Sequence, residues 1–189
     1  MKIAIAGGIG SGKSAVTRIL RALGAHVVVA DEVNAELLSD PNYIDLIKNI
    51  FPSVVHNNII NKKELAQIVY SDENQREKLM ALSHPRIFKR MFSMYQESKV
   101  VFYEIPLLTK TDVTFDAIWY VDASYDTRVR RIALRDNVSE GYAKRIISLQ
   151  REEDFVKEVA SVVIRNEGDE VDLERQVKVL YCSILSKLS

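Results

Sequence analysis

The sequence predicts an α/β fold in which one five-stranded parallel sheet carries helices on both faces. Five short apolar segments have the character of buried strands, at residues 1–6, 26–30, 99–104, 117–122 and 161–165. Segments with helical spacing separate them, and this alternation is typical of parallel sheets, whose strands are buried on both faces. A glycine-rich loop also joins the first strand to the first helix, an arrangement that points a helix N-terminus at an anion.

The glycine-rich loop matches the phosphate-binding P-loop motif G-x-x-x-x-G-K-[ST] in full, because residues 7–14 read Gly-Gly-Ile-Gly-Ser-Gly-Lys-Ser. Its glycines allow backbone N–H groups to point at phosphate oxygens. Lys13 adds a positive charge for the β- and γ-phosphates, and the Ser14 hydroxyl can bind Mg²⁺. The following helix is expected to end at Gly24. A dinucleotide-binding fingerprint fails, because its third glycine would fall on Lys13.

The composition excludes several classes of protein. The 189 residues suffice for one domain with a sizeable core. The 26 basic residues balance 26 acidic ones, so the chain has no excess positive charge that would favour binding to nucleic acid. No apolar stretch reaches the ~20 residues of a membrane span, and the first strand begins too early for a signal peptide. We therefore expect a cytoplasmic protein that binds no membrane. The single cysteine, Cys182, lies in an apolar run and is expected to be a packed core thiol.

Residues 32–98 have a helical pattern almost throughout. This block is too large for a simple crossover and predicts an insertion beside the sheet that binds an acceptor. Asn61 and Glu64 resemble a capping box, with Asn61 as the cap and Glu64 reaching back to it. Residues 71–72 offer a further helix start, and His84 before Pro85 favours a turn or a cap.

The last third of the chain carries a basic cluster. Arg128, Arg131 and Arg135 share one helical face, and a second amphipathic segment that begins near Ser139 carries Lys144, Arg145 and Arg151. The cluster indicates either a mobile flap that closes over polyphosphate or a solvated helix face. A helix over 169–188 closes the chain, and Trp119 is expected in the core.

Two carboxylates end predicted strands at the edge where parallel α/β sheets bind ligands. Asp31 follows the second strand and either accepts a hydroxyl proton or holds a Mg²⁺-bound water, or else it is the N-cap of the next helix. Glu104 ends the third strand and is either a Walker-B-like carboxylate or a structural hydrogen-bonding residue.

The order and spacing of these segments resemble the dephospho-CoA kinase family over nearly the whole chain. The family's G-G-I-G-S-G-K-S-T loop is complete except for Ala15 in place of the threonine. The family patterns L-D-R-K-x-L-x-x-x-V-F, L-x-H-P-x-I, I-P-L-L-F-E and V-I-D-N-x-G have counterparts at 60–70, 82–87, 105–110 and 163–168. The family's V-V-D and R-D recur at 120–122 and 135–136, and the lid's terminal glutamine is Gln150.

The sequence also departs from the family pattern. Val29 replaces the first aspartate of D-A-D, whereas Asp31, the family's proposed catalytic base, is kept. Thr109 and Lys110 replace the end of I-P-L-L-F-E, and Arg165 replaces the aspartate of V-I-D-N-x-G. The family's lysine after the lid falls on Val156, with Lys157 next to it.

The resemblance implies a P-loop kinase with a helical acceptor-binding insertion and a small helical lid. Its core would comprise residues 1–31, 99–125 and 156–189, its CoA-binding insertion 32–98 and its lid 126–155. It implies phosphorylation of the ribose 3′-hydroxyl of dephospho-CoA with ATP and Mg²⁺, in coenzyme A biosynthesis, by a monomer or weak oligomer.

Residue roles follow from the same resemblance. The catalytic residues would be Asp31, Lys13 and Arg135, and Ser14 would bind the metal. The nucleotide would contact Gly8, Ile9, Gly10, Ser11, Gly12, Lys13, Ser14, Ala15 and Asn166, with the segment around Asn166 beside the adenine. The acceptor would contact Asp31, Lys62, His84 and Pro106.

Two other functions stay open at this point. Another kinase of the nucleoside-monophosphate type would share the core and the lid but differ in the acceptor block. A P-loop switch or regulatory ATPase would instead act through a protein partner, although no switch-like segment is evident.

Overall fold

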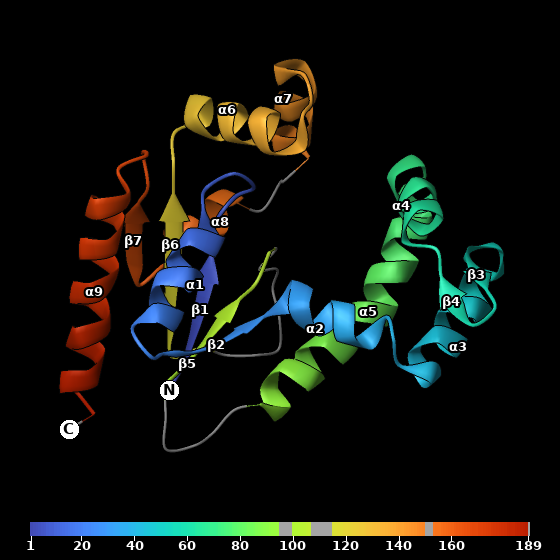
Figure 1. The fold of residues 1–189 in the computed structure, drawn as a ribbon, viewed down its shortest axis with the longest axis horizontal. Coiled ribbons are helices and arrows are strands. Elements are labelled where there is room, and N and C mark those ends of the chain that lie inside the picture. Colours follow the sequence, from blue (N-terminus) through green and yellow to red (C-terminus); the bar gives the residue numbers. More distant parts are fainter. Residues whose placement is uncertain (95–99, 107–114, 150–152, 189) are drawn as a thin grey trace. The chain divides into compact units, whose positions relative to one another are not determined.

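The computed structural model describes residues 1–94, 100–106, 115–149 and 153–188. The chain forms two compact units (Figure 1). The first unit comprises Met1–Val28 with Gln96–Ser189, and the second comprises Val29–Tyr95. No helix within the described ranges is long and apolar enough to cross a membrane.

The five expected strands form one sheet in the order β2-β5-β1-β6-β7. Their bounds are β1 (Lys2–Ala6), β2 (His26–Val29), β5 (Val101–Glu104), β6 (Ala117–Asp122) and β7 (Val162–Arg165). β1 pairs in parallel with β5 and β6, and β6 pairs in parallel with β7. The predicted α/β fold with a five-stranded parallel sheet is confirmed.

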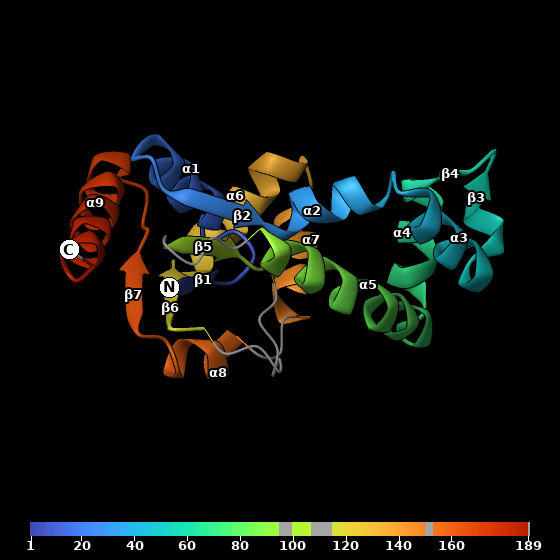
Figure 2. The ribbon, with the colours of Figure 1, turned by 90° about the horizontal axis from the view of Figure 1, so that it is seen from below.

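Helices cover both faces of this sheet, α1 (Lys13–Ala22) and α9 (Glu170–Ser186) on one face and α8 (Glu153–Glu158) on the other (Figure 2). Alternate strand residues point at α1 and α9 and pack with them into one apolar core, among them Ile3, Ile5, Phe102, Trp119, Val121 and Ile164. Trp119 is 1% exposed, so its predicted core position is confirmed. On the other face, Lys157 of α8 donates to Asp122 at 2.8 Å.

The first helix ends as the sequence predicts. Gly24 has a φ of 83°, a left-handed conformation that glycine adopts without strain. The N–H of Gly24 bonds the carbonyl of Arg21, and the N–H of Ala25 bonds that of Leu20. These two bonds form a Schellman motif, which satisfies the carbonyls at the end of α1.

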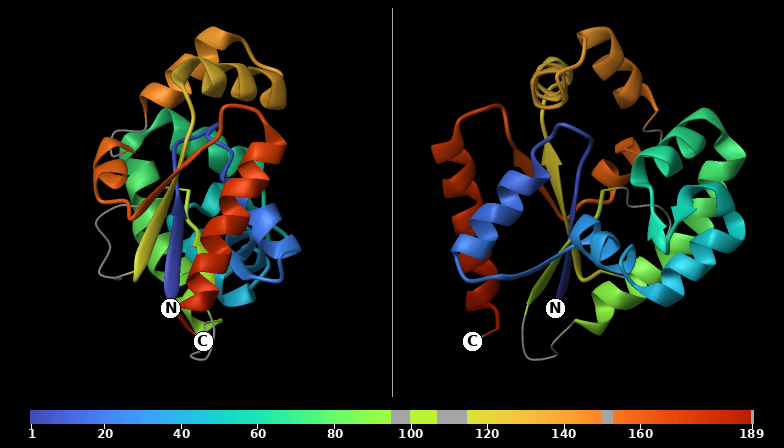
Figure 3. Two further views of the ribbon diagram at one scale, coloured as in Figure 1. Left: turned by 90° about the vertical axis from the view of Figure 1, so that its left-hand side faces the viewer. Right: turned by 45° about the vertical axis from the view of Figure 1, so that its right-hand side comes forward.

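Two helices, α6 (Tyr125–Asp136) and α7 (Glu140–Ser148), form a hairpin at the end of β6 (Figure 3). Asn137 makes the turn with a φ of 53°, and Ser139 caps α7 by accepting the N–H of Tyr142. Their facing sides share a small core formed by Val129, Ile132, Ala143 and Ile147. Ile9 of the P-loop packs against this core.

The second unit consists of α2 (Ala30–Leu37), α3 (Pro41–Ile50), a 3₁₀ turn η1 (Pro52–Val54), β3 (Val55–His56), β4 (Ile59–Ile60), α4 (Lys62–Ser71) and α5 (Glu73–Ser93). Its own core is built around Tyr43, Ile47, Phe51, Val54 and Leu65. The nearly all-helical expectation missed the antiparallel β3–β4 hairpin. Asn57 and Asn58, both at positive φ, form its two-residue turn, a known hairpin signal of asparagine.

Two local expectations in this unit need correction. Asn61 caps α4 by accepting the N–H groups of Lys63 and Glu64, but Glu64 does not reach back. The N–H of Asn61 already bonds the carbonyl of Val54, and the Glu64 carboxylate instead pairs with His56 at 2.8 Å.

The His84–Pro85 pair marks neither a turn nor a cap, because both residues lie inside α5. Pro85 and Ala81, whose carbonyl loses its helical partner to the proline, both lie on the exposed side of the helix. Water can therefore satisfy that carbonyl, and the helix continues.

The expected burial of Cys182 is also wrong, since its side chain is exposed. α9 buries the stripe formed by Leu173, Val177 and Ile184. Cys182 lies on the opposite side of the helix, because five residues beyond Val177 correspond to a rotation of about 140°.

Candidate functional site

The P-loop leads directly into α1, whose N-cap is Gly12 with a φ of 96°. No side chain caps this helix, and its first turn carries no acid, so its N–H groups and its dipole favour an anion. A Cβ on Gly12 would collide with the amide of Asn166, which explains the need for glycine there. Lys13 Nζ donates to the carbonyls of Gly7 at 2.6 Å and Gly8 at 3.3 Å.

Side chains from α6 bind the outward-facing carbonyls of this loop. Arg128 Nε donates to the carbonyl of Ile9 at 2.9 Å, and Arg128 is only 9% exposed. Arg131 donates to the carbonyls of Gly10 at 3.4 Å and Ser11 at 3.2 Å. The reading of this basic face as a solvated helix surface is therefore wrong for Arg128 and Arg131.

Arg135 lies one turn further along α6 and has a different partner. Its guanidinium binds Asp136 through two bonds of 2.8 Å, and this pairing lowers the pKa of Asp136. Of the second basic segment, Lys144 and Arg145 lie on α7, whereas Gln150 and Arg151 lie outside the described residues.

Asn166, directly after β7, connects α6 with the P-loop. Its Nδ2 donates to the carbonyl of Ser11 at 2.8 Å, and its Oδ1 accepts from Arg131 at 3.1 Å. The side chain is 6% exposed, so these bonds fix its orientation in a buried setting. Arg128, Arg131 and Asn166 thus converge on the P-loop.

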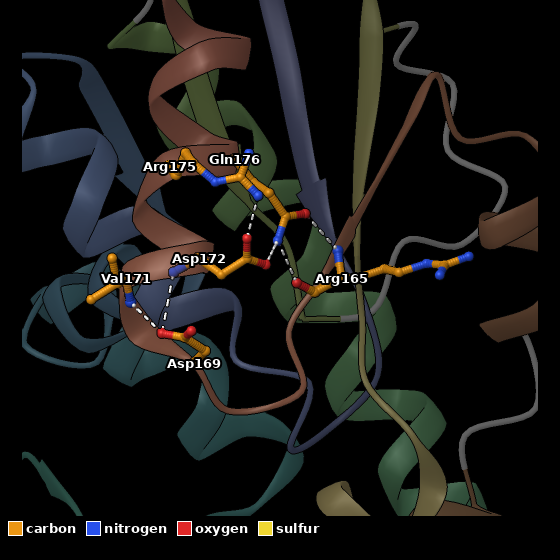
Figure 4. A network of polar contacts seen from close by, with 6 residues as sticks. All are labelled: Arg165, Asp169, Val171, Asp172, Arg175 and Gln176. Carbon is orange, nitrogen blue, oxygen red and sulfur yellow. Dashed lines mark hydrogen bonds and ion pairs between the residues drawn. The ribbon is translucent and has the colours of Figure 1, made fainter.

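The end of β7 is held through main-chain atoms, as Figure 4 shows. Gln176 of α9 accepts the N–H of Arg165 at 3.2 Å and donates to its carbonyl at 3.0 Å. Asp172 in turn accepts from Gln176 at 2.8 Å. The Arg165 side chain extends away from α9 (Figure 4), so an arginine can replace the family's aspartate without loss of these bonds.

Glu104 is the buried carboxylate of the site, with 6% exposure at the end of β5. It accepts the hydroxyl of Thr17 at 2.8 Å, and the Ser14 hydroxyl lies 3.4 Å from its other oxygen. The sequence did not single out Thr17, although its place three residues after Ser14 puts both hydroxyls on one face of α1.

These oxygen donors suit a hard cation. Mg²⁺ is usually bound by one or two protein oxygens together with substrate phosphates and water. No group of three or more His, Cys, Asp or Glu side chains in the described ranges could hold a metal alone. The Ser14 hydroxyl backed by the Glu104 carboxylate therefore fits a metal that arrives with a nucleotide.

The remaining predicted site residues have separate surroundings. Pro106 is exposed just after β5, and Thr109 and Lys110 lie outside the described residues. Lys62 is exposed as the first residue of α4. His84 is half-buried beside the edge of Phe88, with ring centroids 6.4 Å apart, and burial lowers its pKa.

Asp31 lies in the first turn of α2 with an exposed side chain. The N-cap of α2 is Val29, so the interpretation of Asp31 as the N-cap is wrong. The helix begins at Ala30, earlier than the pattern indicated, and this places Asp31 inside the helix. Asp31, Lys62 and His84 all belong to the second unit.

Known proteins resemble this chain over its full length. The family model for dephospho-CoA kinase matches residues 1–172. A dephospho-CoA kinase of Geobacter metallireducens is 32% identical, over 98% of this chain and 97% of its own. One of Thermobifida fusca is 29% identical, over 100% and 98%.

Solved structures share the fold of this chain. TT1252 from Thermus thermophilus superposes with a TM-score of 0.81 at 30% identity, over 97% of each chain. A shikimate kinase from Acinetobacter baumannii, at 15% identity and a TM-score of 0.57, shares the fold alone. With its P-loop, the buried carboxylate behind Ser14 and these matches, the chain belongs to the dephospho-CoA kinase family.

Proposed function

We propose that this protein transfers the γ-phosphoryl group of ATP to the ribose 3′-hydroxyl of dephospho-CoA and so forms coenzyme A. The observation that carries the proposal is a P-loop held by side chains of α6 and by Asn166, in a chain that matches the dephospho-CoA kinase family over residues 1–172. We assign the core to residues 1–31, 99–125 and 156–189, the acceptor segment to 32–98 and the lid to 126–155. The two compact units divide at slightly different positions, after Val28 and after Tyr95.

The nucleotide would be bound by the P-loop. The N–H groups of residues 8–15 and the start of α1 would contact the phosphates, and Lys13 would exchange its bonds to Gly7 and Gly8 for phosphate oxygens. Asn166 adjoins the same loop through Ser11, which supports its assignment to the nucleotide.

Ser14 would hold Mg²⁺ together with the phosphates, and Glu104 would orient that hydroxyl and bind metal-coordinated water. The metal would offset charge on the β- and γ-phosphates. We therefore add Glu104 to the site, as the Walker-B-like carboxylate.

Transfer needs few covalent steps. The acceptor oxygen bonds to the γ-phosphorus as the bond from that phosphorus to the ADP oxygen breaks, and the hydroxyl proton passes to Asp31. Arg135 would leave Asp136 to offset the developing charge. Lys62, His84 and Pro106 would contact the acceptor, and closure around it would exclude water as a competing acceptor.

A coupled assay of ADP formation with three acceptors tests the proposal. Turnover with dephospho-CoA, against little with AMP or shikimate, is expected. Preference for AMP would instead support a kinase of the nucleoside-monophosphate type. Hydrolysis without any acceptor would support a regulatory ATPase. We further infer that the protein is cytoplasmic and is a monomer or weak oligomer. Sedimentation of the purified protein would check the oligomeric state.

A further inference from the structure

Glu167 binds the beginning of α6 from a loop far away in the sequence. Its Oε1 accepts the backbone N–H of Ser124 at 2.7 Å. Its Oε2 accepts the hydroxyls of Ser124 at 2.9 Å and Thr127 at 3.1 Å. These bonds favour the charged carboxylate and lower its pKa.

This carboxylate supplies a contact that α6 lacks within its own sequence. The N-cap of α6 is Ser124, whose side chain makes no capping bond to the helix. A negative charge at this end also favours the helix dipole. Glu167 therefore fixes the first turn of α6 to the loop between β7 and α9.

α6 in turn holds the outer side of the P-loop. Arg128 and Arg131 bind the carbonyls of Ile9, Gly10 and Ser11. The helix backbone also comes close, since a Cβ on Gly10 would lie 2.9 Å from the carbonyl oxygen of Arg128. A displacement of α6 must therefore move the loop.

Asn166 links the same elements a second time, because it neighbours Glu167 in the chain and bonds both Ser11 of the P-loop and Arg131 of α6. Its own N–H bonds the carbonyl of Asp122, at the end of β6. The P-loop, α6 and residues 166–167 thus restrain one another pairwise.

We infer that Glu167 is a positioning residue for nucleotide binding: it holds α6 so that Arg128 and Arg131 keep the P-loop carbonyls turned outward. With those carbonyls held, the loop's N–H groups stay directed at the phosphates, and less order must be imposed when nucleotide binds. The inference rests on the proposed function only in taking ATP as the ligand.

The test compares Glu167→Gln with Glu174→Gln, which makes the same charge change at an exposed position of α9 outside this network. Calorimetric titration with ADP and steady-state kinetics with ATP and dephospho-CoA are measured for both. Glu167→Gln is expected to weaken ADP binding and raise the KM for ATP by about fivefold, within the range found for residues that act on a site indirectly. The kcat and the KM for dephospho-CoA should stay within about twofold, and Glu174→Gln should match the parent.

The variants Glu167→Asp and Thr127→Val sharpen the test. Glu167→Asp keeps the charge and should recover part of the affinity. Glu167→Gln combined with Thr127→Val should weaken ADP binding by less than the sum of the two single losses, because the two changes share the contact between the Thr127 hydroxyl and the Glu167 carboxylate.

Unchanged ADP affinity in a folded Glu167→Gln protein would overturn the inference. So would a loss shared by both KM values and kcat alongside a lower melting temperature, because that pattern marks a general structural role. If the parent protein binds ADP but does not phosphorylate dephospho-CoA, the proposed function fails while the titration still tests Glu167.

Discussion

Glu104 offers a sharp test of the nucleotide site, because two substitutions separate its two possible roles. Thr17→Val removes the hydroxyl that donates to Glu104 at 2.8 Å and keeps the side chain's shape. Glu104→Gln keeps an oxygen that can accept from Thr17 but removes the negative charge near Ser14. The first change perturbs the fold, and the second perturbs the charge.

The magnitudes follow from the burial of both partners, since Thr17 is 3% and Glu104 6% exposed. A hydrogen bond to a charged group contributes about 1.5–3 kcal/mol. For a protein of this size, losing it should lower the melting temperature by about 3–12 °C. Because Glu104→Gln retains the acceptor, its melting temperature should fall less. Residues that support a metal ligand typically change metal affinity or activity by roughly 10–100-fold.

The assay is a Mg²⁺ titration of phosphoryl transfer at saturating ATP and dephospho-CoA, with a thermal melt of each variant. Glu104→Gln should need at least about tenfold more Mg²⁺ for half-maximal rate, whereas Thr17→Val should lie near the parent. If Glu104→Gln melts as low as Thr17→Val while its Mg²⁺ requirement stays unchanged, Glu104 is a structural carboxylate and the reasoning fails.

Three further outcomes are expected. Lys13→Ala should abolish transfer while circular dichroism and melting match the parent and the exposed-lysine control Lys178→Ala; normal turnover would refute the P-loop assignment. Hydrogen exchange with and without an ATP analogue should show that the analogue protects α7 more than the start of α6, because Arg128 and Arg131 already bind carbonyls of the P-loop. Equal protection of α7 with and without the analogue would argue against a closing lid. Burial lowers the pKa of His84 below its ordinary value of 6.5, so the unfolded chain takes up the His84 proton before the folded protein does as the pH falls. The free energy of unfolding measured with urea should therefore decline as the pH drops through 6.5, and His84→Gln should lessen that decline. Identical slopes for the parent and the variant would contradict this expectation.

The sheet was predictable because each strand is a short, continuous apolar run with a clear end, as is typical of strands buried on both faces. The P-loop was predictable because its motif fixes both the turn and the helix that follows. The β3–β4 hairpin escaped because its two-residue strands are too short to carry a period, although Asn57-Asn58 could have indicated the turn.

The supports of the site were harder to predict, because they join residues far apart in the chain. Helical spacing placed Arg128 and Arg131 on one face, but only the fold shows that the face meets carbonyls about 120 residues earlier in the sequence. Glu104 was visible as a strand-end carboxylate, whereas Thr17 and Glu167 follow no motif. The burial of Cys182 was predicted wrongly, because the apolar run around it was taken as buried without considering where Cys182 lies around the helix.

The central claim is that this chain phosphorylates a hydroxyl of dephospho-CoA whose proton is taken by Asp31. The most direct measurement is the single-turnover rate of transfer from ATP to dephospho-CoA by Asp31→Asn, beside Glu32→Gln as a matched loss of charge in the same helical turn. The account predicts a fall of roughly 10²–10⁴-fold for Asp31→Asn, with nucleotide affinity and melting temperature nearly unchanged and Glu32→Gln close to the parent. A folded Asp31→Asn protein that transfers phosphate within a few-fold of the parent rate would contradict it.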